Sequence, residues 1–306
     1  MTDTHHQPVL YHEIIHSLRP QSPGRYVDGT VGAGGHARGI LEACAPDGEL
    51  LGFDLDPQAL ALARETLAPF GQRVHLVQAS YTTLPAALAG LGWDAVDGIV
   101  LDLGLSSMQL DTPERGFSFQ HDAPLDMRFD PQNPVTAASL VNGLSEDDLA
   151  DLLFRYGEET HGRRIARAIV RARPLQTTGM LAAAIEATLP RRGRVHPATQ
   201  TFQALRIAVN EELAAVAEVL PKAVAALRSG GRLAVISFHS LEDRIVKDYF
   251  REQSRDLVNP PYEPIYEVER KALIKEITRK PILPSEQEVN KNPKARSAKL
   301  RVAEKL

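Results

Sequence analysis

Four short apolar segments recur in the first hundred residues, and each is followed by an acidic or polar side chain. They cover residues 26–27, 50–53, 74–78 and 96–101. A helix-like segment separates each of the four from the one that follows it. A fifth apolar run occupies residues 232–239, and a plausible last, antiparallel strand covers 298–303. Strands alternating with helices at this spacing predict an α/β fold with a doubly wound, Rossmann-like parallel sheet, whose ligand lies at the carboxyl ends of the strands.

A glycine-rich turn links the first strand to the first helix. Residues 32–37, Gly-Ala-Gly-Gly-His-Ala, satisfy the loose nucleotide-binding pattern G-x-G-x-x-G/A. Glycines permit the tight turn and a close approach of the backbone to a ligand, and the helix start offers free N–H groups. Asp54 follows about 20 residues later, where an acid meets ribose hydroxyls. The pattern alone does not distinguish NAD from S-adenosylmethionine (SAM).

Asp28 makes that distinction, because it stands at the strand end just before the glycines. A carboxylate there would repel a pyrophosphate, whereas the ammonium and sulfonium of SAM would be attracted. Capping of the loop backbone by Asp28 is an equal alternative, and both roles can hold together. Asp54, Tyr81 and Asp102 follow the other three strands, so we expect all four side chains to face one cleft that binds SAM.

The alternation of predicted strands and helices stops between about residues 108 and 197. Ser145, with Asp148 three residues later, predicts the start of a helix, and further helical patterns follow. The sequence therefore predicts a methyltransferase-like sheet domain in two parts, 1–107 and 198–306, with a helical insertion at 108–197 and a basic C-terminal tail. In the second part, we expect one helix through residues 202–216 that ends or kinks at Pro221.

Charge and cysteine content restrict the function. A net charge of −4 argues against a protein that coats polyanions, so any nucleic-acid contact must be a local basic patch. Arginines are dense in 163–173 and 191–194, which indicates either contact with nucleic-acid phosphates or a solvated face. The single cysteine, Cys44, excludes an intrachain disulfide and is expected in the core. No signal peptide or membrane-spanning run is apparent, which predicts a cytoplasmic protein with no membrane partner.

Seven motifs in order closely resemble the bacterial 16S rRNA (cytosine-N4)-methyltransferases of the MraW type. The resemblance covers nearly the whole chain, from His6 to Ser297. The motifs occupy residues 28–36 (DGTVGAGGH), 102–107 (DLGLSS), 109–111 (QLD), 114–119 (ERGFSF), 124–128 (PLDMR), 201–206 (TFQALR) and 237–244 (SFHSLEDR).

The resemblance implies a class I SAM-dependent methyltransferase with an inserted, all-helical, rRNA-binding domain. It implies methylation of the exocyclic amine of a cytidine in the decoding centre, with the assembled small subunit preferred over free RNA. Tyr81 stands where the family commonly has Phe and keeps an adenine-stacking face. The implied SAM contacts are Gly34, Gly35, His36, Asp54, Asp102 and Gln109.

The chemistry of the amine points to further residues. The lone pair of a cytosine amine is delocalised into the ring, so catalysis needs in-line positioning and an acceptor for developing positive charge. Asp102 is the candidate acceptor, while Phe238 or His239 could stack on the base. A role for His239 as a satisfied strand-end histidine is an equal alternative. Residues 259–262, Asn-Pro-Pro-Tyr, spell a motif of amine methyltransferases, but no strand is predicted to present them. No metal site is predicted.

Rival functions are also defined by the sequence. A cytosine-C5 methyltransferase needs a cleft cysteine, and Cys44 is badly placed for that role. A 2′-O-methyltransferase usually needs a cleft lysine, and no lysine precedes Lys222. A non-catalytic assembly factor that retains SAM, or methylation of another rRNA position, are the remaining alternatives. The oligomeric state is left open, with a homodimer as one alternative.

Overall fold

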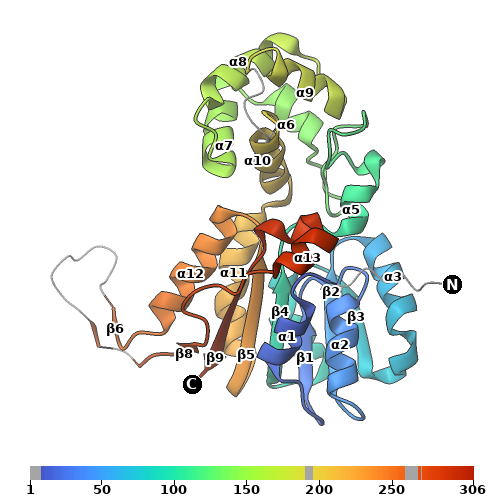
Figure 1. The fold of residues 1–306 in the computed structure, drawn as a ribbon, viewed down its shortest axis with the longest axis vertical. Helices are drawn as coiled ribbons and strands as arrows, with labels where there is room; N and C mark the ends of the chain where they lie inside the picture. Colours follow the sequence, from blue (N-terminus) through green and yellow to red (C-terminus); the bar gives the residue numbers. More distant parts are fainter. Residues whose placement is uncertain (1–7, 190–195, 259–267, 270) are drawn as a thin grey trace. The chain divides into compact units, whose positions relative to one another are not determined.

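The computed structural model describes residues 8–189, 196–258, 268–269 and 271–306, which form two compact units (Figure 1). The first, here called the sheet unit, comprises Met1–Gly104 and Leu213–Leu306. The second, the helical unit, comprises Leu105–Glu212. No helix in the described part of the chain is long and apolar enough to cross a bilayer.

A seven-stranded sheet forms the centre of the sheet unit, with strand order β3-β2-β1-β4-β5-β9-β8. The first five strands in this order are parallel, and β9 and β8 are antiparallel additions at one edge. The predicted Rossmann-like sheet and its last antiparallel strand are confirmed, whereas β8 was not predicted. The strands are β1 (Arg25–Asp28), β2 (Glu49–Asp54), β3 (Val74–Gln78), β4 (Val96–Asp102), β5 (Leu227–Ser237), β8 (Ile274–Glu276) and β9 (Lys299–Lys305). A separate two-stranded sheet pairs β6 (Leu257–Val258) with β7 (Val268–Glu269).

Helices cover both faces of this sheet. Side chains alternate between the faces along a strand, so Tyr26 packs into one core cluster with α1, α2 and α3, and Val27 into the other with α4, α11 and α12. Asp56 caps α3 by accepting the Gln58 N–H at 3.0 Å. The helices are α1 (Tyr11–Leu18), α2 (Gly35–Ala43), α3 (Pro57–Leu67), α4 (Leu84–Leu91), α11 (Glu212–Ala226), α12 (Ser240–Gln253) and α13 (Glu286–Lys291).

The helical unit has its own apolar core and, among its described residues, no strand beyond an isolated bridge between Pro124 and Thr177. The Ser145 side chain accepts the Asp148 N–H at 3.1 Å, which confirms the predicted start of α7. The helices are α5 (Ser107–Asp111), α6 (Ala137–Gly143), α7 (Glu146–Gly157), α8 (Gly162–Ala172), α9 (Thr178–Glu186) and α10 (Thr199–Asn210).

Two sequence-based expectations differ from this arrangement. The unit boundaries fall at 104/105 and 212/213 rather than at 107/108 and 197/198, because α10 buries Phe202, Leu205 and Val209 in the helical core. The predicted helix end at Pro221 is wrong, since Pro221 lies inside α11, and the alternative of a kink there stays a prediction. The chain instead leaves α10 at Glu211, whose φ of 51° is left-handed. The segments 191–194 and 259–262 lie outside the described residues.

A buried ion pair joins α12 to β9 in the sheet unit. Asp243 accepts from Arg301 Nε at 2.6 Å and from Lys299 Nζ at 3.3 Å, and the Arg301 side chain is 6% exposed. Burial works against the charged carboxylate, but the two cations outweigh it and hold the pKa of Asp243 below its ordinary value. Removing one partner of such a pair leaves a buried charge without compensation.

We therefore expect Asp243→Ala to lower the free energy of unfolding by about 3–5 kcal/mol. The matched change Asp248→Ala, at an exposed position on the same helix beside Lys247, should cost less than about 1 kcal/mol. Urea unfolding of the two variants measures this difference. Equal stability of both variants would contradict the importance of the buried pair.

Candidate cofactor and active site

Three acidic residues lie at the carboxyl ends of three adjacent parallel strands. Asp28 ends β1, Asp54 ends β2 and Asp102 ends β4, and β1 lies between the other two strands. Strand register places Asp28 opposite Gly52 on one side and Val100 on the other. The sheet thus gathers three carboxylates at the edge where α/β folds bind their ligands.

Asp28 is 1% exposed and uses its two oxygens differently. Oδ1 accepts the Thr30 N–H at 3.1 Å, whereas Oδ2 is buried and has no hydrogen-bond partner among the described residues. Burial raises the pKa of Asp28 to about 6, against the lowering effect of His36 and Thr30. The residue therefore caps the loop with one oxygen and keeps the other available for a ligand.

Asp54 ties the glycine loop to β2. Its Oδ2 accepts the Gly32 N–H at 2.9 Å, and its Oδ1 accepts the Asp56 N–H at 2.9 Å. Burial raises the pKa of Asp54, although these backbone hydrogen bonds oppose the shift. Each carboxylate oxygen has two lone pairs, so Asp54 can still accept hydrogen bonds from a ligand hydroxyl.

His36 lies beside Asp102, with Nε2 at 3.5 Å from Asp102 Oδ2. The imidazole is buried, and neither its nitrogens nor Asp102 Oδ1 makes a hydrogen bond of good geometry within the described chain. Burial disfavours the imidazolium, but Asp102 and then Asp28 outweigh this effect and raise the pKa of His36. His36 therefore offsets part of the negative charge at this edge.

The backbone of the glycine loop is shaped by two of its glycines. Gly34 precedes α2 with a φ of 88°, a conformation that L side chains rarely adopt. Gly35, the first residue of α2, packs against the ring of Pro8 so closely that a Cβ would clash with it. Tyr11 stacks on His36 with ring centroids 6.3 Å apart. The segment around Pro8 and Tyr11 thus holds the loop in place.

Tyr81 follows β3 and begins a short 3-10 helix, η2 (Tyr81–Thr83). Its side chain is partly buried against the sheet core and lies next to Gly29, where an added Cβ would be 3.2 Å from Tyr81 Cβ. The aromatic ring is thus held beside the residue that follows Asp28, which suits the predicted contact with adenine.

His239 follows β5 and serves as the N-cap of α12. Its Nδ1 accepts the Glu242 N–H at 3.4 Å, and its Nε2 lies 3.1 Å from Oε1 of the buried Glu242. Phe238 lies beside Gly104, where an added Cβ would be 3.5 Å from the ring. These contacts confirm a structural role for His239, whose ring is held at the start of α12. Its catalytic role stays a prediction.

Gln109 belongs to the helical unit, where it is 5% exposed and caps α5. Its Oε1 accepts the Ser106 N–H at 3.1 Å, and Ser106 Oγ accepts the Gln109 N–H at 3.1 Å. Its predicted contact with SAM stays a prediction.

Sequence reasoning missed two residues of the sheet edge. Thr30 Oγ1 accepts the Asp102 N–H at 2.7 Å and so joins the glycine loop to β4. Glu288 in α13 accepts the Leu10 N–H at 2.7 Å and adds negative charge near His36. Thr30 lies inside the motif and could have been considered, whereas 278 residues separate Leu10 from Glu288 and no local pattern signals their contact.

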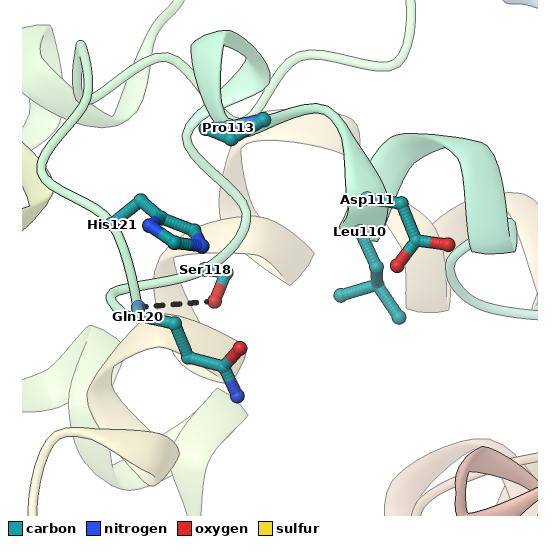
Figure 2. Close-up of a pocket in the computed structure, with 6 residues that line it drawn as sticks. All are labelled: Leu110, Asp111, Pro113, Ser118, Gln120 and His121. Carbon is teal, nitrogen blue, oxygen red and sulfur yellow. Dashed lines mark hydrogen bonds between the residues drawn. The ribbon is translucent and has the colours of Figure 1, made fainter.

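The helical unit contains a pocket of about 200 Å³ (Figure 2). Ser118 Oγ accepts the Gln120 N–H there at 3.2 Å. None of the predicted site residues lines this pocket. Its lining residues are Leu110, Asp111, Pro113, Ser118, Gln120 and His121.

The sheet edge fits a cationic cofactor. Asp28 Oδ2 and Asp102 Oδ1 are buried carboxylate oxygens without hydrogen-bond partners among the described residues, so an ammonium or sulfonium would compensate them. A pyrophosphate would meet the same two carboxylates with like charge. A doubly wound sheet with a glycine loop and this acidic edge defines the class I SAM-dependent methyltransferases.

Comparison with known proteins identifies the family. The sequence model of the MraW methylase family matches residues 3–306, so the chain belongs to this family and is a methyltransferase that uses SAM. It is 53% identical over 312 residues to ribosomal RNA small subunit methyltransferase H of Geotalea uraniireducens, with 100% of both chains covered. It is 50% identical to the protein of the same name from Heliobacterium modesticaldum, with 99% of each covered. An rRNA methylase structure from Streptococcus thermophilus aligns over 97% and 93% of the chains, with 11% identity and a TM-score of 0.45.

We expect Asp28→Asn to stabilise the protein without SAM and to weaken SAM binding. Folding raises the pKa of the Asp28 carboxyl from 3.8 to about 6, so the protonated carboxyl favours the folded state. This contribution to stability is fully present below pH 3.8 and is lost as the pH rises through about 6. A neutral Asn avoids this loss, which is worth on the order of 3 kcal/mol at most at pH 8. Thermal unfolding at pH 8 measures the gain, and Asp47→Asn in an exposed turn is the control.

Calorimetric titration with SAM measures the second half of this prediction. The wild-type affinity should fall as the pH drops through about 6, because protonation of Asp28 removes negative charge from the site. Asp28→Asn should bind at least about tenfold more weakly at pH 8, a change of about 1.4 kcal/mol. Unchanged affinity in this variant would remove Asp28 from the cofactor site.

Proposed function

We propose that this methyltransferase modifies the exocyclic N4 amine of a cytidine in the decoding centre of 16S rRNA. Its substrate is the assembled small ribosomal subunit, which it meets in the cytoplasm. The names of its relatives, ribosomal RNA small subunit methyltransferase H, support an rRNA substrate. The observation that carries the chemistry is Asp102 Oδ1 at the end of a central strand, a buried oxygen without a hydrogen-bond partner among the described residues.

Different residues at the sheet edge bind different parts of SAM. Asp54 accepts the ribose hydroxyls, and Tyr81 supplies a stacking face for adenine. Asp28 and Asp102 attract the cationic groups. The remaining contacts come from Gly34, Gly35, His36 and Gln109.

Asp102 has the central part in the transfer step. SAM, when bound, supplies a methyl group activated by the positive sulfonium. The amine gains positive charge as its bond to the methyl carbon forms, and it must then lose a proton. Asp102 Oδ1 can accept a hydrogen bond from that amine and stabilise the charge as it develops. The buried site strengthens this interaction because little water screens it.

Phe238 and His239 follow β5, the strand next to β4, so we assign base positioning to this pair. The Nδ1 of His239 accepts a hydrogen bond at the start of α12 and its Nε2 lies against Glu242, which leaves the ring face for the substrate. Stacking on an aromatic ring holds a base without regard to its hydrogen-bonding edge, so Asp102 would supply the selection of the amine.

Labelled SAM and small subunits that lack the modification provide the direct test. Nucleoside mass spectrometry of the product should find N4-methylcytidine in the decoding centre, and free 16S rRNA should be a poorer substrate. Label on ribose, on carbon 5 or at another position would overturn the assignment. Absence of label with SAM still bound would favour a non-catalytic assembly factor.

We expect Asp102→Ala to lower kcat by about 10²–10³-fold at saturating SAM, the range typical of removing one group that stabilises charge in a transition state. Asp94→Ala, an exposed position just before the same strand begins, should leave kcat unchanged. Single-turnover methyl transfer to small subunits measures both variants. Full turnover by Asp102→Ala would contradict the proposed mechanism.

A further inference from the structure

One helix of the helical unit presents an uncompensated positive face. α8 contains four arginines and no acidic residue. Successive residues of a helix are about 100° apart, so the four lie within an arc of about 100°, opposite the buried side formed by Ile165, Ala166 and Ile169. All four are exposed. This arginine face consists of Arg163, Arg164, Arg167 and Arg171.

The arginines of this segment differ in what they contact. Arg167 pairs with Glu146 of α7 at 3.1 Å, with both side chains well exposed. The side chains of Arg163, Arg164 and Arg171 make no ion pair or hydrogen bond with any described residue. Arg173, just beyond the helix, donates to the carbonyls of Val141 and Leu144 at 2.6 Å each. Arg173 is therefore structural, and three arginines of the face remain available.

An exposed aromatic residue lies near the first turn of α8. Phe154 of α7 is 66% exposed, more than any other large apolar residue in the described chain. Gly162, the first residue of α8, packs against α7, where an added Cβ would lie 3.1 Å from the Ala150 carbonyl oxygen and 3.7 Å from the Phe154 backbone nitrogen. Phe154 thus lies beside the end of α8 that carries Arg163. The acidic first turn of α7 lies two turns away, near Arg167.

We propose that Phe154 and the arginine face form a binding surface for single-stranded RNA. The three unpaired guanidinium groups bind phosphates, and the Phe154 ring stacks on an unpaired base. From Arg163 to Arg171 the helix rises about 12 Å, which spans three or four phosphates of a stacked strand. The surface rests on the proposed rRNA substrate and adds the residues that hold RNA outside the cofactor site.

Fluorescence anisotropy with a labelled, unstructured 12-nucleotide RNA tests this surface in the full-length protein. The triple variant Arg163→Ala/Arg164→Ala/Arg171→Ala should bind at least about tenfold more weakly at low salt. It should also reduce the slope of log Kd against log salt by about 2, since each phosphate contact to a single strand contributes about 0.7. Phe154→Ala should weaken binding about fivefold or more without changing that slope.

Control variants separate the surface from general effects of charge and folding. Arg64→Ala, an exposed position on α3, removes one positive charge from the sheet unit and should leave RNA binding unchanged. Because the three arginines lack partners, the triple variant should unfold at the wild-type temperature, whereas Arg173→Ala should lower it. RNA affinity of the triple variant equal to that of Arg64→Ala would overturn the proposal.

Two further measurements identify the partner and isolate the proposed function. If polyglutamate displaces the labelled RNA from Phe154 and the arginine face as effectively as unlabelled RNA does, the partner is an acidic protein and the assignment is overturned. Methyl transfer to small subunits by the wild-type protein is assayed separately. If the wild-type protein methylates small subunits and the triple variant binds RNA as tightly as the wild type, only this surface is refuted. If the wild-type protein does not methylate small subunits, only the proposed function is refuted.

Discussion

Carboxylates buried at the ends of parallel strands need positive charge nearby, because water no longer solvates them. Asp28 and Asp102 each have one buried oxygen in this position, and His36 supplies only part of the compensation. The glycine loop, the strand ends and the Pro8–Tyr11 segment hold these groups in place even though an unpaired carboxylate oxygen weakens the fold. We propose that the cationic cofactor resolves this conflict and that the uncompensated charge of the free protein contributes to its affinity for SAM.

Several polar residues at this edge have a structural role and a proposed chemical role together. Asp28 caps the loop with one oxygen and leaves the other free, and Asp54 bridges the loop to the start of α3. His239 caps α12 through one ring nitrogen. Because backbone contacts fix these side chains before any ligand arrives, little conformational freedom remains to be lost on binding. The two interpretations of such residues are therefore complementary rather than competing.

The sheet and its acidic edge could be predicted from the sequence because both depend on local pattern. The alternation of strands and helices fixes which strand ends share an edge, so Asp28, Asp54 and Asp102 could be grouped without coordinates. The place of α10 could not be predicted, since an apolar helix face reads the same whichever core it joins. The contact of Glu288 with Leu10 also escaped prediction because it joins the two ends of the chain. The arginine face was visible in the sequence, but only the structure separates Arg173, which binds carbonyls, from the arginines without partners.

A crystal structure of the protein with bound SAM tests the central claim most directly. The account predicts that SAM lies at the carboxyl edge of β1, β2 and β4, beside Gly34, Asp54 and Asp102. Its cationic groups should lie within ion-pair distance of Asp28 Oδ2 and Asp102 Oδ1. SAM bound at any other place, or at this edge with both of those oxygens still unpartnered, would contradict it.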